Sequence, residues 1–232
     1  KSSIEDHFDV NFTLEENLRK NGKNEMLTIL QKTNIPSIHY VRQPYPKGLG
    51  DAILQAAPFV GDEPFVVLLG DDIMPNDIPL TKLLMDTYEM TEGGVVATMR
   101  IPNNLVNRYG IIDIQDQVSE HVYSVDHFIE KPNLEDAPSN LAIIGRYLLT
   151  PEIFDVLRSQ KPDSGNEVQL TDAIEALNQI HPLTAFEYTG KRCDVGDKYG
   201  LLIANIEFGL KKPETAKKMH DYIIALSKEL KK

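Results

Sequence analysis

Two short apolar runs constrain the fold more than any other feature of the sequence. They are "PFVVLLG" (Pro64–Gly70) and "GVVATMRI" (Gly94–Ile101). Successive side chains of a β-strand point to opposite faces of the sheet, so a strand that is apolar at every position needs cover on both faces. We therefore expect both runs to be central strands of a sheet that has helices packed on either side.

Strand and helix patterns alternate along the rest of the chain. "SIHYVR" (Ser37–Arg42) predicts a strand, "GDAILQAAPF" a helix, and "PLTKLLMDTYEM" a further helix. Near the N-terminus the capping box that begins at Thr13 predicts a helix through about Lys32, with Gly22 as a weak point. Further strands are expected at "YGIIDI", "VYSVDHFIEK", "NLAIIGRYLL" and "TAFEY", and helices at residues 151–159, at residues 167–179 and, as a pair, at the C-terminal end.

Strands separated by helices are typical of one fold class. We predict an α/β fold: a three-layer α/β/α sandwich around a mixed, mostly parallel central sheet, in which the middle run of strands is an antiparallel insertion. No stretch has the composition of a linker, so the sequence predicts a single domain over residues 1–232.

Charge and cysteine content exclude some functions. The formal net charge is −11 at pH 7, which argues against a nucleic-acid-binding or anionic-membrane-binding surface, since both need clustered Lys and Arg. Cys193 is the single cysteine and cannot form an internal disulfide. The sequence has no leader pattern and no long apolar span, so we expect a cytoplasmic protein.

Four stretches fall at predicted strand ends, which is where ligands of open α/β sheets bind. The first is "RQPYPKGLGDAI" (Arg42–Ile53). The amide of Gln43 both donates and accepts hydrogen bonds, which suits a pyrimidine edge. Gly48 and Gly50 let the backbone approach a planar ring without a Cβ in the way. The alternative for this stretch is a turn with a purely structural role.

The second stretch, "VVLLGDDIM", places Asp71 and Asp72 after what we predict to be the most buried strand. Two adjacent carboxylates repel each other unless a cation compensates their charge. Mg²⁺ is a suitable cation because it binds through one or two carboxylates together with substrate phosphates. The alternative is a solvated turn whose acids cap a helix.

The third and fourth stretches carry three more charged candidates. In "DHFIEKPN", Glu130 could accept hydrogen bonds from sugar hydroxyls and Lys131 could meet a phosphate, but adjacent strand residues face opposite ways unless the strand bends. An ion pair at the surface is the alternative. In "RCDVGDKYG", Asp194 is either a second carboxylate at the metal or the N-cap of the following helix.

Taken in order, these stretches and their neighbours resemble one family. Gln-Pro-x-x-x-Gly-Leu-Gly-Asp-Ala, Leu-Gly-Asp-Asp, Tyr-Gly-Ile-Ile, Glu-Lys-Pro, Ile-Gly-Arg-Tyr, Glu-Val-Gln-Leu-Thr-Asp-Ala and Cys-Asp-Val-Gly-Asp-Lys follow one another. The sequence is thereby similar to the bacterial UTP–glucose-1-phosphate uridylyltransferases, also called UDP-glucose pyrophosphorylases, which have the sugar-nucleotidyltransferase fold. The resemblance runs from Lys1 to the C-terminal helices.

The resemblance implies an activity and a set of roles. The expected reaction is Mg²⁺-assisted transfer of a uridylyl group from UTP to glucose 1-phosphate, giving UDP-glucose and pyrophosphate. The implied contacts are Gln43 and Gly48 with uracil; Gly110, Glu130 and Gly145 with glucose; Lys131 with the sugar phosphate; and Asp71, with Asp194 beside it, at the metal. The family commonly has one acid where this chain has Asp71 and Asp72, so the resemblance gives Asp72 no definite role. A thymidylyltransferase of the same fold and a non-catalytic sugar-nucleotide-binding module are the alternatives.

One family feature does not occur in this sequence. An N-terminal strand, a Gly-x-Gly-Thr-Arg loop and a downstream Pro-Lys cradle the triphosphate in the family, whereas this sequence opens with "KSSIEDHFD". We therefore expect the chain to lack roughly 60 residues of the family's N-terminal part, on the scale of two βα units. We also expect this 232-residue chain to be inactive by itself and to self-associate through a bared sheet edge, with a homo-oligomer as its working form.

Overall fold

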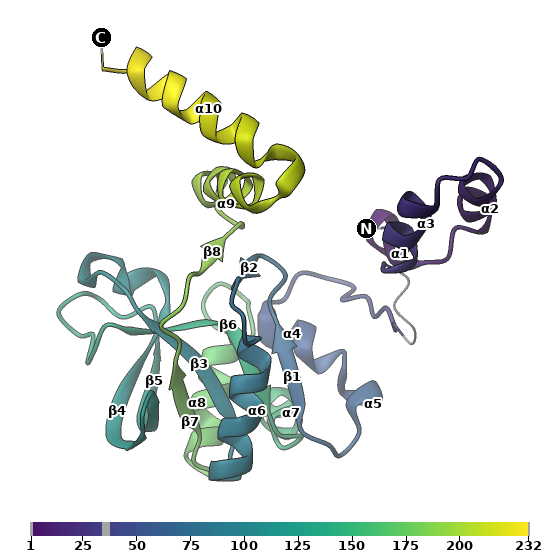
Figure 1. Cartoon of the computed structure of the whole chain (residues 1–232). Helices are drawn as coiled ribbons and strands as arrows, with labels where there is room; N and C mark the ends of the chain where they lie inside the picture. The colour runs from purple at the N-terminus through teal and green to yellow at the C-terminus, as the bar shows by residue number, and fades with distance from the viewer. Residues whose placement is uncertain (1, 34–37, 232) are drawn as a thin grey trace. The chain divides into compact units, whose positions relative to one another are not determined.

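The structure, a computed structural model, describes residues 2–33 and 38–231. It has two compact units, Lys1–Pro44 and Tyr45–Lys232. Figure 1 follows the chain through both. The single domain expected over residues 1–232 stays a prediction.

The first unit is helical. Its helices are α1 (Ser2–Phe8), α2 (Phe12–Lys20) and α3 (Asn24–Gln31). The break between α2 and α3 lies at Gly22, the predicted weak point, whose φ of 67° is accessible to glycine at little cost. Thr13 is not the helix cap, because Asn11 accepts a hydrogen bond from the Leu14 amide at 3.0 Å and α2 begins one residue before Thr13.

The strand expected at "SIHYVR" is not formed over residues 38–42, and Ser37 lies outside the described residues. A strand needs a neighbouring strand to pair with, which an apolar pattern alone does not supply. Residues up to Pro44 belong to the helical unit, whereas the sheet belongs to the second unit.

The second unit contains the sheet and the helices that cover it. Its elements are α4 (Leu49–Leu54), α5 (Ala57–Val60), β1 (Phe65–Leu68), β2 (Asp72–Ile73), α6 (Leu80–Thr91), β3 (Val95–Arg100), the 3-10 helix η1 (Asn103–Arg108), β4 (Gly110–Ser119), β5 (Val122–Glu130), β6 (Leu141–Leu149), α7 (Ile153–Ser159), α8 (Leu170–Asn178), β7 (Thr184–Glu187), β8 (Cys193–Asp194), α9 (Lys198–Lys211) and α10 (Pro213–Glu229). Over the described ranges, six strands form one sheet in the order β1-β6-β3-β7-β5-β4, and β2 pairs separately with β8.

The sheet is mixed, as expected, but its pairing is not mostly parallel. β3 and β7 pair in parallel, whereas β6 runs antiparallel between β1 and β3. β1, β3 and β7 therefore run in the same direction, although β3 with β7 is the one parallel pair among the pairings just described. The middle strands β4 and β5 form the predicted antiparallel pair, and β5 continues antiparallel onto β7.

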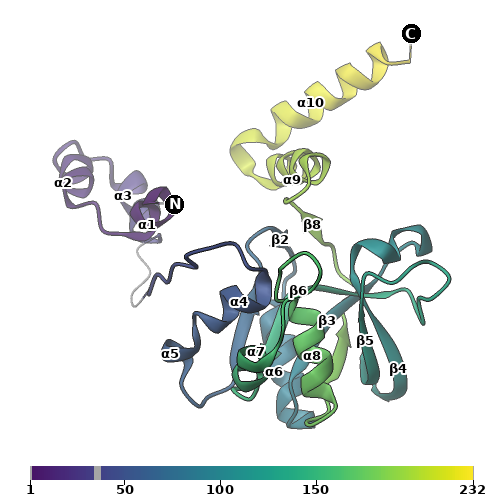
Figure 2. The same ribbon diagram turned by 180° about the vertical axis from the view of Figure 1, so that it is seen from behind.

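Helices cover both faces of the sheet, which confirms the three layers. Leu84 of α6 packs with Ile144 and Leu148 of β6 on one face. On the other face, Tyr147 and Leu149 of the same strand pack with residues of α4, α7 and α8. Figures 1 and 2, which view the sheet from opposite sides, show α6 in front in the first and the α7–α8 pair in front in the second.

The most buried strand is β6 rather than β1. β1 stands at one end of the sheet with β6 as its neighbour, and Leu68 is 54% exposed. An apolar pattern indicates how many faces of a strand are apolar, but it does not give the position of the strand in the sheet. "PFVVLLG" was therefore wrongly predicted to be central, whereas "GVVATMRI" forms the buried strand β3 as expected.

Candidate functional site

A cavity of about 280 Å³ opens in the second unit beyond the ends of β1 and β5. It brings together six residues from five separate predicted stretches and strands: Asp71, Gly110, Glu130, Lys131, Gly145 and Asp194. Other residues that line it were given no role by the sequence, among them Arg108, Tyr109, Tyr147, Thr171 and Arg192.

The two predicted uracil contacts, Gln43 and Gly48, are not among the residues that line the cavity. Gln43 belongs to the first unit, so the structure does not place it relative to the cavity. Gly48 precedes Leu49, which lines the cavity, and has a φ of 91°. A Cβ on Gly48 would lie 2.7 Å from the Val168 carbonyl oxygen, so glycine is required here by the packing of the backbone itself.

Asp71 and Asp72 have opposite environments although they are adjacent. Asp71 is exposed, whereas Asp72 is 5% exposed. The buried carboxylate of Asp72 accepts a hydrogen bond from the Gly145 amide at 2.9 Å through Oδ2. It also accepts from Arg192, whose Nε lies 2.6 Å from Oδ1 and whose Nη2 lies 3.0 Å from Oδ2. The charge of Asp72 is thus compensated by a cation within the protein.

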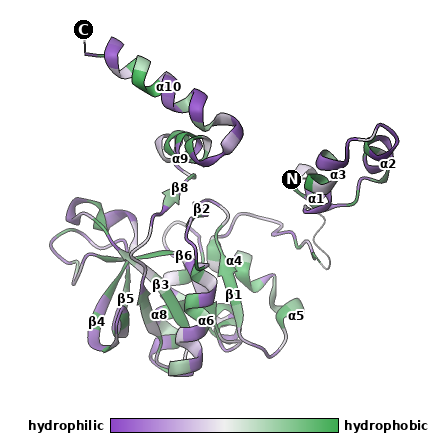
Figure 3. Ribbon diagram, viewed as in Figure 1, coloured by the Kyte–Doolittle hydropathy of each residue, from purple (hydrophilic) through white to green (hydrophobic). Residues whose placement is uncertain are grey.

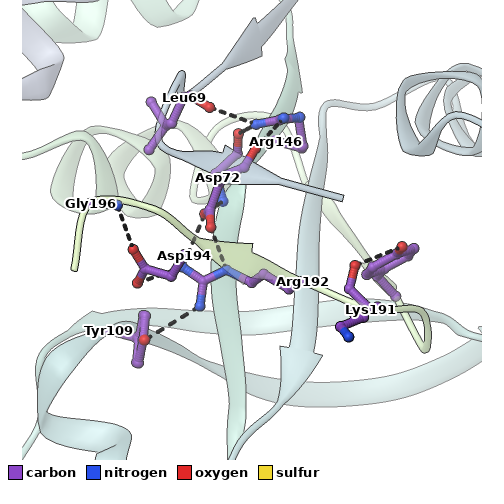
Figure 4. Close-up of polar contacts among 10 residues, drawn as sticks. Leu69, Asp72, Tyr109, Arg146, Lys191, Arg192, Asp194 and Gly196 are labelled. Atoms are coloured by element: carbon purple, nitrogen blue, oxygen red, sulfur yellow. Dashed lines mark hydrogen bonds and ion pairs between the residues drawn. The ribbon is translucent and has the colours of Figure 1, made fainter. Parts of the chain in front are cut away.

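Arg192 connects three parts of the cavity wall (Figure 4). Besides Asp72, its Nη1 donates to the Tyr109 hydroxyl at 3.3 Å, and its Nη2 lies 3.5 Å from Asp194 Oδ2. Its Cζ also lies over the Tyr109 ring, 5.2 Å from the centroid. Burial lowers the pKa of Arg192, but the hydrogen bonds with Asp72 and Tyr109 outweigh this, so the pKa is raised and the side chain stays charged.

A second arginine fixes the backbone behind Asp72. Arg146 of β6 donates to the Leu69 and Gly145 carbonyl oxygens at 2.9 and 2.7 Å, and to the Asp72 carbonyl oxygen. Sequence reasoning quoted both arginines within motifs but assigned them no function. Their partners are 74 or more residues away for the bonds to Asp72, so no local pattern signals the contact.

Asp71 and Asp194 approach the same point. β2 pairs with β8 so that Asp72 is opposite Asp194, and the Val195 amide donates to the Asp71 carbonyl oxygen at 2.8 Å. A Cβ placed on Gly196 would lie 2.9 Å from Asp71 Oδ2 and 3.3 Å from Asp194 Oδ1. The two carboxylates therefore flank Gly196. Asp194 is not the cap of α9, because Asp197 accepts the hydrogen bond from the Gly200 amide instead.

Glu130 and Lys131 both line the cavity, because the backbone bends between them. Lys131 has a φ of 44°, in the left-handed region that is unfavourable for a residue with a Cβ. Its Nζ lies 3.2 Å from Glu130 Oε1, and its amide donates to the Tyr109 carbonyl oxygen at 3.1 Å. This is the strand bend that the sequence required if both side chains were to face one ligand. Strained backbone of this kind clusters at functional sites.

Two glycines keep the floor of the cavity open. A Cβ on Gly145 would lie 2.8 Å from Asp72 Oδ2, and one on Gly110 would lie 2.8 Å from Ile143 Cδ1 and 3.0 Å from Thr171 Oγ1. Any larger residue would displace these neighbours. Beside them, burial raises the pKa of the Tyr147 hydroxyl, with smaller contributions from Glu130 and Asp72, so this group stays neutral.

The charges of the lining suit a cation and an anionic ligand together. Four carboxylates and three cationic side chains line the cavity: Asp71, Asp72, Glu130 and Asp194 against Arg108, Lys131 and Arg192. Over the described part of the chain, no group of three or more His, Cys, Asp or Glu side chains could hold a metal ion. A cation here would take two carboxylates from the protein and its remaining ligands from the substrate and water.

Comparisons with known proteins identify the family to which the chain is similar. The nucleotidyl transferase family profile matches residues 9–208. UTP–glucose-1-phosphate uridylyltransferase 2 of Streptococcus pyogenes serotype M3 is 54% identical over the whole chain, which covers 79% of that protein. UTP-bound UGPase from Acinetobacter baumannii has a TM-score of 0.86 at 33% identity, over 97% of this chain and 79% of that one. A UDP-glucose pyrophosphorylase complexed with UDP-glucose has a TM-score of 0.81 at 37% identity, over 91% of this chain and 78% of that one.

Proposed function

Because the chain belongs to the nucleotidyl transferase family, and within it to the UTP–glucose-1-phosphate uridylyltransferases, we propose that its cavity is the site at which UTP and glucose 1-phosphate give UDP-glucose and pyrophosphate. The observation that carries this proposal is that six residues of the family motifs line one cavity in a chain that is 54% identical to a uridylyltransferase over its whole length. That identity also makes a thymidylyltransferase the weaker alternative.

The reaction needs no general base from the protein. The second pKa of a phosphate monoester is about 6, so glucose 1-phosphate carries close to two negative charges at neutral pH and is itself the nucleophile. One of its oxygens attacks the α-phosphorus of UTP in line, a new P–O bond forms, and the bond to pyrophosphate breaks. The protein contributes position and charge, which fits a cavity lined by charged side chains without a nucleophile–base pair.

Each residue role rests on position. Lys131 offsets the charge of the sugar phosphate, and the bend that gives it a φ of 44° keeps its ammonium beside Glu130, which accepts hydrogen bonds from glucose hydroxyls. Gly110 and Gly145 leave room along the sugar. Gln43 and Gly48 contact the uracil, a role supported by the amide chemistry of Gln43 and by the position of Gly48 next to the cavity-lining Leu49.

Asp71 and Asp194 hold the divalent cation, which we take to be Mg²⁺. Their carboxylates flank Gly196, and oxygen ligands from one or two carboxylates are what Mg²⁺ takes from a protein when phosphates supply the rest. When bound, it would offset the negative charge that accumulates on the phosphates. Asp72 is not a ligand in this proposal, because its oxygens are occupied by Arg192 and the Gly145 amide.

We propose the cytoplasm as the compartment of this reaction. Cys193, buried and free, is consistent with a reducing compartment. No helix among the residues that the structure describes is long and apolar enough to cross a membrane.

Nucleotide choice tests the function. Pyrophosphate release by the protein that carries this chain, with glucose 1-phosphate and each of UTP, dTTP and CTP, should give a kcat/KM for UTP at least about tenfold above the others. CTP differs from UTP in the donors and acceptors of its base, whereas dTTP differs by the 5-methyl group and the missing 2′-hydroxyl. A site that rejects these differences by about 1.4 kcal/mol gives the tenfold ratio. Reactions without glucose 1-phosphate are the control. Equal or faster turnover of dTTP would contradict the uridylyl assignment.

A further inference from the structure

Arg192 has no assigned role in this reaction, yet it is the most connected side chain of the cavity. Its side chain is 13% exposed, and its guanidinium reaches Asp72 twice, Tyr109 once and Asp194 once. A guanidinium is a planar fork with five donors, so several partners fix both its position and its plane. An ammonium in the same place could neutralise Asp72 but could not hold this geometry.

The strands that Arg192 connects are too short to hold each other. β2 and β8 have two residues each, with Asp72 opposite Asp194 and Ile73 opposite Cys193, and one further bond joins the Val195 amide to the Asp71 carbonyl oxygen. Isolated two-stranded pairs are marginal in water even when they are longer. Asp72 is the first residue of β2, and Arg192 immediately precedes β8. The ion pair between them therefore adds a side-chain link between the two strands of this ladder.

The same ladder sets the distance between the two carboxylates of the cation site. Asp71 precedes β2, Asp194 ends β8, and both carboxylates flank Gly196. These carboxylates repel each other in the absence of a cation. Arg192 counters that repulsion in two ways, since its charge lies 3.5 Å from Asp194 Oδ2 and its bond to Asp72 holds β8 against β2.

We propose that Arg192 is a positioning residue which, by its forked bond to Asp72, keeps Asp71 and Asp194 at the spacing that a divalent cation requires. In this role it acts through the carboxylates, because a guanidinium has no acceptor with which to bind a cation. The inference rests on the proposed function, because it assumes that Asp71 and Asp194 form the cation site.

The test compares Arg192→Lys with wild type in two measurements. The first is hydrogen exchange of the backbone amides of Val195 and Gly196, without any ligand. The second is the affinity for Mn²⁺, followed by the electron paramagnetic resonance of the free ion in the presence of UDP-glucose. We expect faster exchange at these two amides and an affinity for Mn²⁺ about tenfold or more weaker, as is usual when the groups behind metal ligands are changed. Arg158→Lys is the matched control, because Arg158 forms an exposed pair with Asp155 on α7.

A double variant separates a loss of stability from a loss of affinity for Mn²⁺. Asp72→Asn with Arg192→Gln leaves no unpaired buried charge, so its melting temperature should recover most of what Arg192→Gln alone loses, whereas its affinity for Mn²⁺ should stay low because glutamine lacks the fork. Unchanged exchange at Val195 and Gly196 in Arg192→Lys would overturn the proposal. So would faster exchange with an unchanged affinity for Mn²⁺, which would make Arg192 merely structural. Neither of these results would contradict the proposed function, which is tested on the wild type. A wild type that neither binds Mn²⁺ nor turns over UTP would overturn the proposed function and this inference with it.

Discussion

The two adjacent aspartates after β1 show how position decides the role of a residue. From the residue pattern alone both were candidates for the cation site, whereas the family resemblance assigned Asp71 to the metal and gave Asp72 no definite role. The structure separates them by burial, with Asp71 exposed and Asp72 enclosed by Arg192 and the Gly145 amide. Asp72 binds an internal cation, Arg192, which is 120 residues away in the sequence. Whether a carboxylate binds such an internal cation or an external one therefore depends on a distant partner.

Substitution of each aspartate should therefore change a different property. Asp71→Asn should abolish cation-dependent turnover and leave the free energy of unfolding nearly unchanged, because an exposed carboxylate is removed. Asp72→Asn should lower the free energy of unfolding by about 3–5 kcal/mol, because it leaves the buried charge of Arg192 uncompensated. Urea unfolding and pyrophosphate-release kinetics, run on both variants, check this. Loss of stability in Asp71→Asn, with a stable Asp72→Asn, would contradict the assignment.

At the scale of elements, the sequence predicted the type of most helices and strands but not their neighbours. The strands β3 to β7 lie where apolar runs end at turn residues, because that pattern is local. The failures at "SIHYVR" and "PFVVLLG" concern pairing, which depends on other parts of the chain. The motifs also drew attention to six residues that line one cavity, while the arginines that contact them across the chain were given no role.

The β5–α8 contact gives a prediction for pH. Glu175 of α8 accepts hydrogen bonds from the Phe128 amide at 2.7 Å and is paired with His127 Nδ1 at 2.9 Å. The hydrogen bond with Glu175 raises the pKa of His127 above its ordinary value. A raised pKa stabilises the folded state fully below the ordinary pKa of about 6.5, and this contribution is lost as the pH rises through the folded-state pKa.

Replacement of His127 should thus matter only in acid. His127→Gln should have a slightly lower melting temperature than wild type at about pH 5.5 and the same melting temperature at about pH 9, since the pair is exposed and weak. Calorimetry across this range measures the difference. His220→Gln is the control, because the ring of His220 lies 3.4 Å from its chain neighbour Asp221 and connects no two elements. A difference that grows toward alkaline pH would contradict the sign.

For the whole molecule, the largest unexplained feature is apolar surface on α9 and α10. α9 has the sequence "KYGLLIANIEFGLK", which is apolar on most sides, yet Ala204 is its single buried residue. Figure 3 shows the hydrophobic colouring along this helix. A helix that is apolar all round is normally enclosed by protein. Tyr199 is 72% exposed, Leu202 is 63% exposed and Tyr222 of α10 is 62% exposed.

We therefore predict that the chain self-associates and that α9 and α10 take part. Light scattering at several concentrations should give a mass above that of one chain. Leu202→Glu combined with Tyr222→Glu should shift this mass toward the monomer without lowering the melting temperature, because both side chains are exposed within the chain. Ile180→Glu is the matched control, since Ile180 is 65% exposed but follows α8 instead. Association that survives the double variant would locate the interface elsewhere. The next surface to test would be the edge strand β1. Its half-exposed residues have β6 on one side and leave a sheet edge on the other. A monomer at every concentration would refute the prediction, and it would mean that α9 tolerates in water an apolar surface that helices of this composition usually bury.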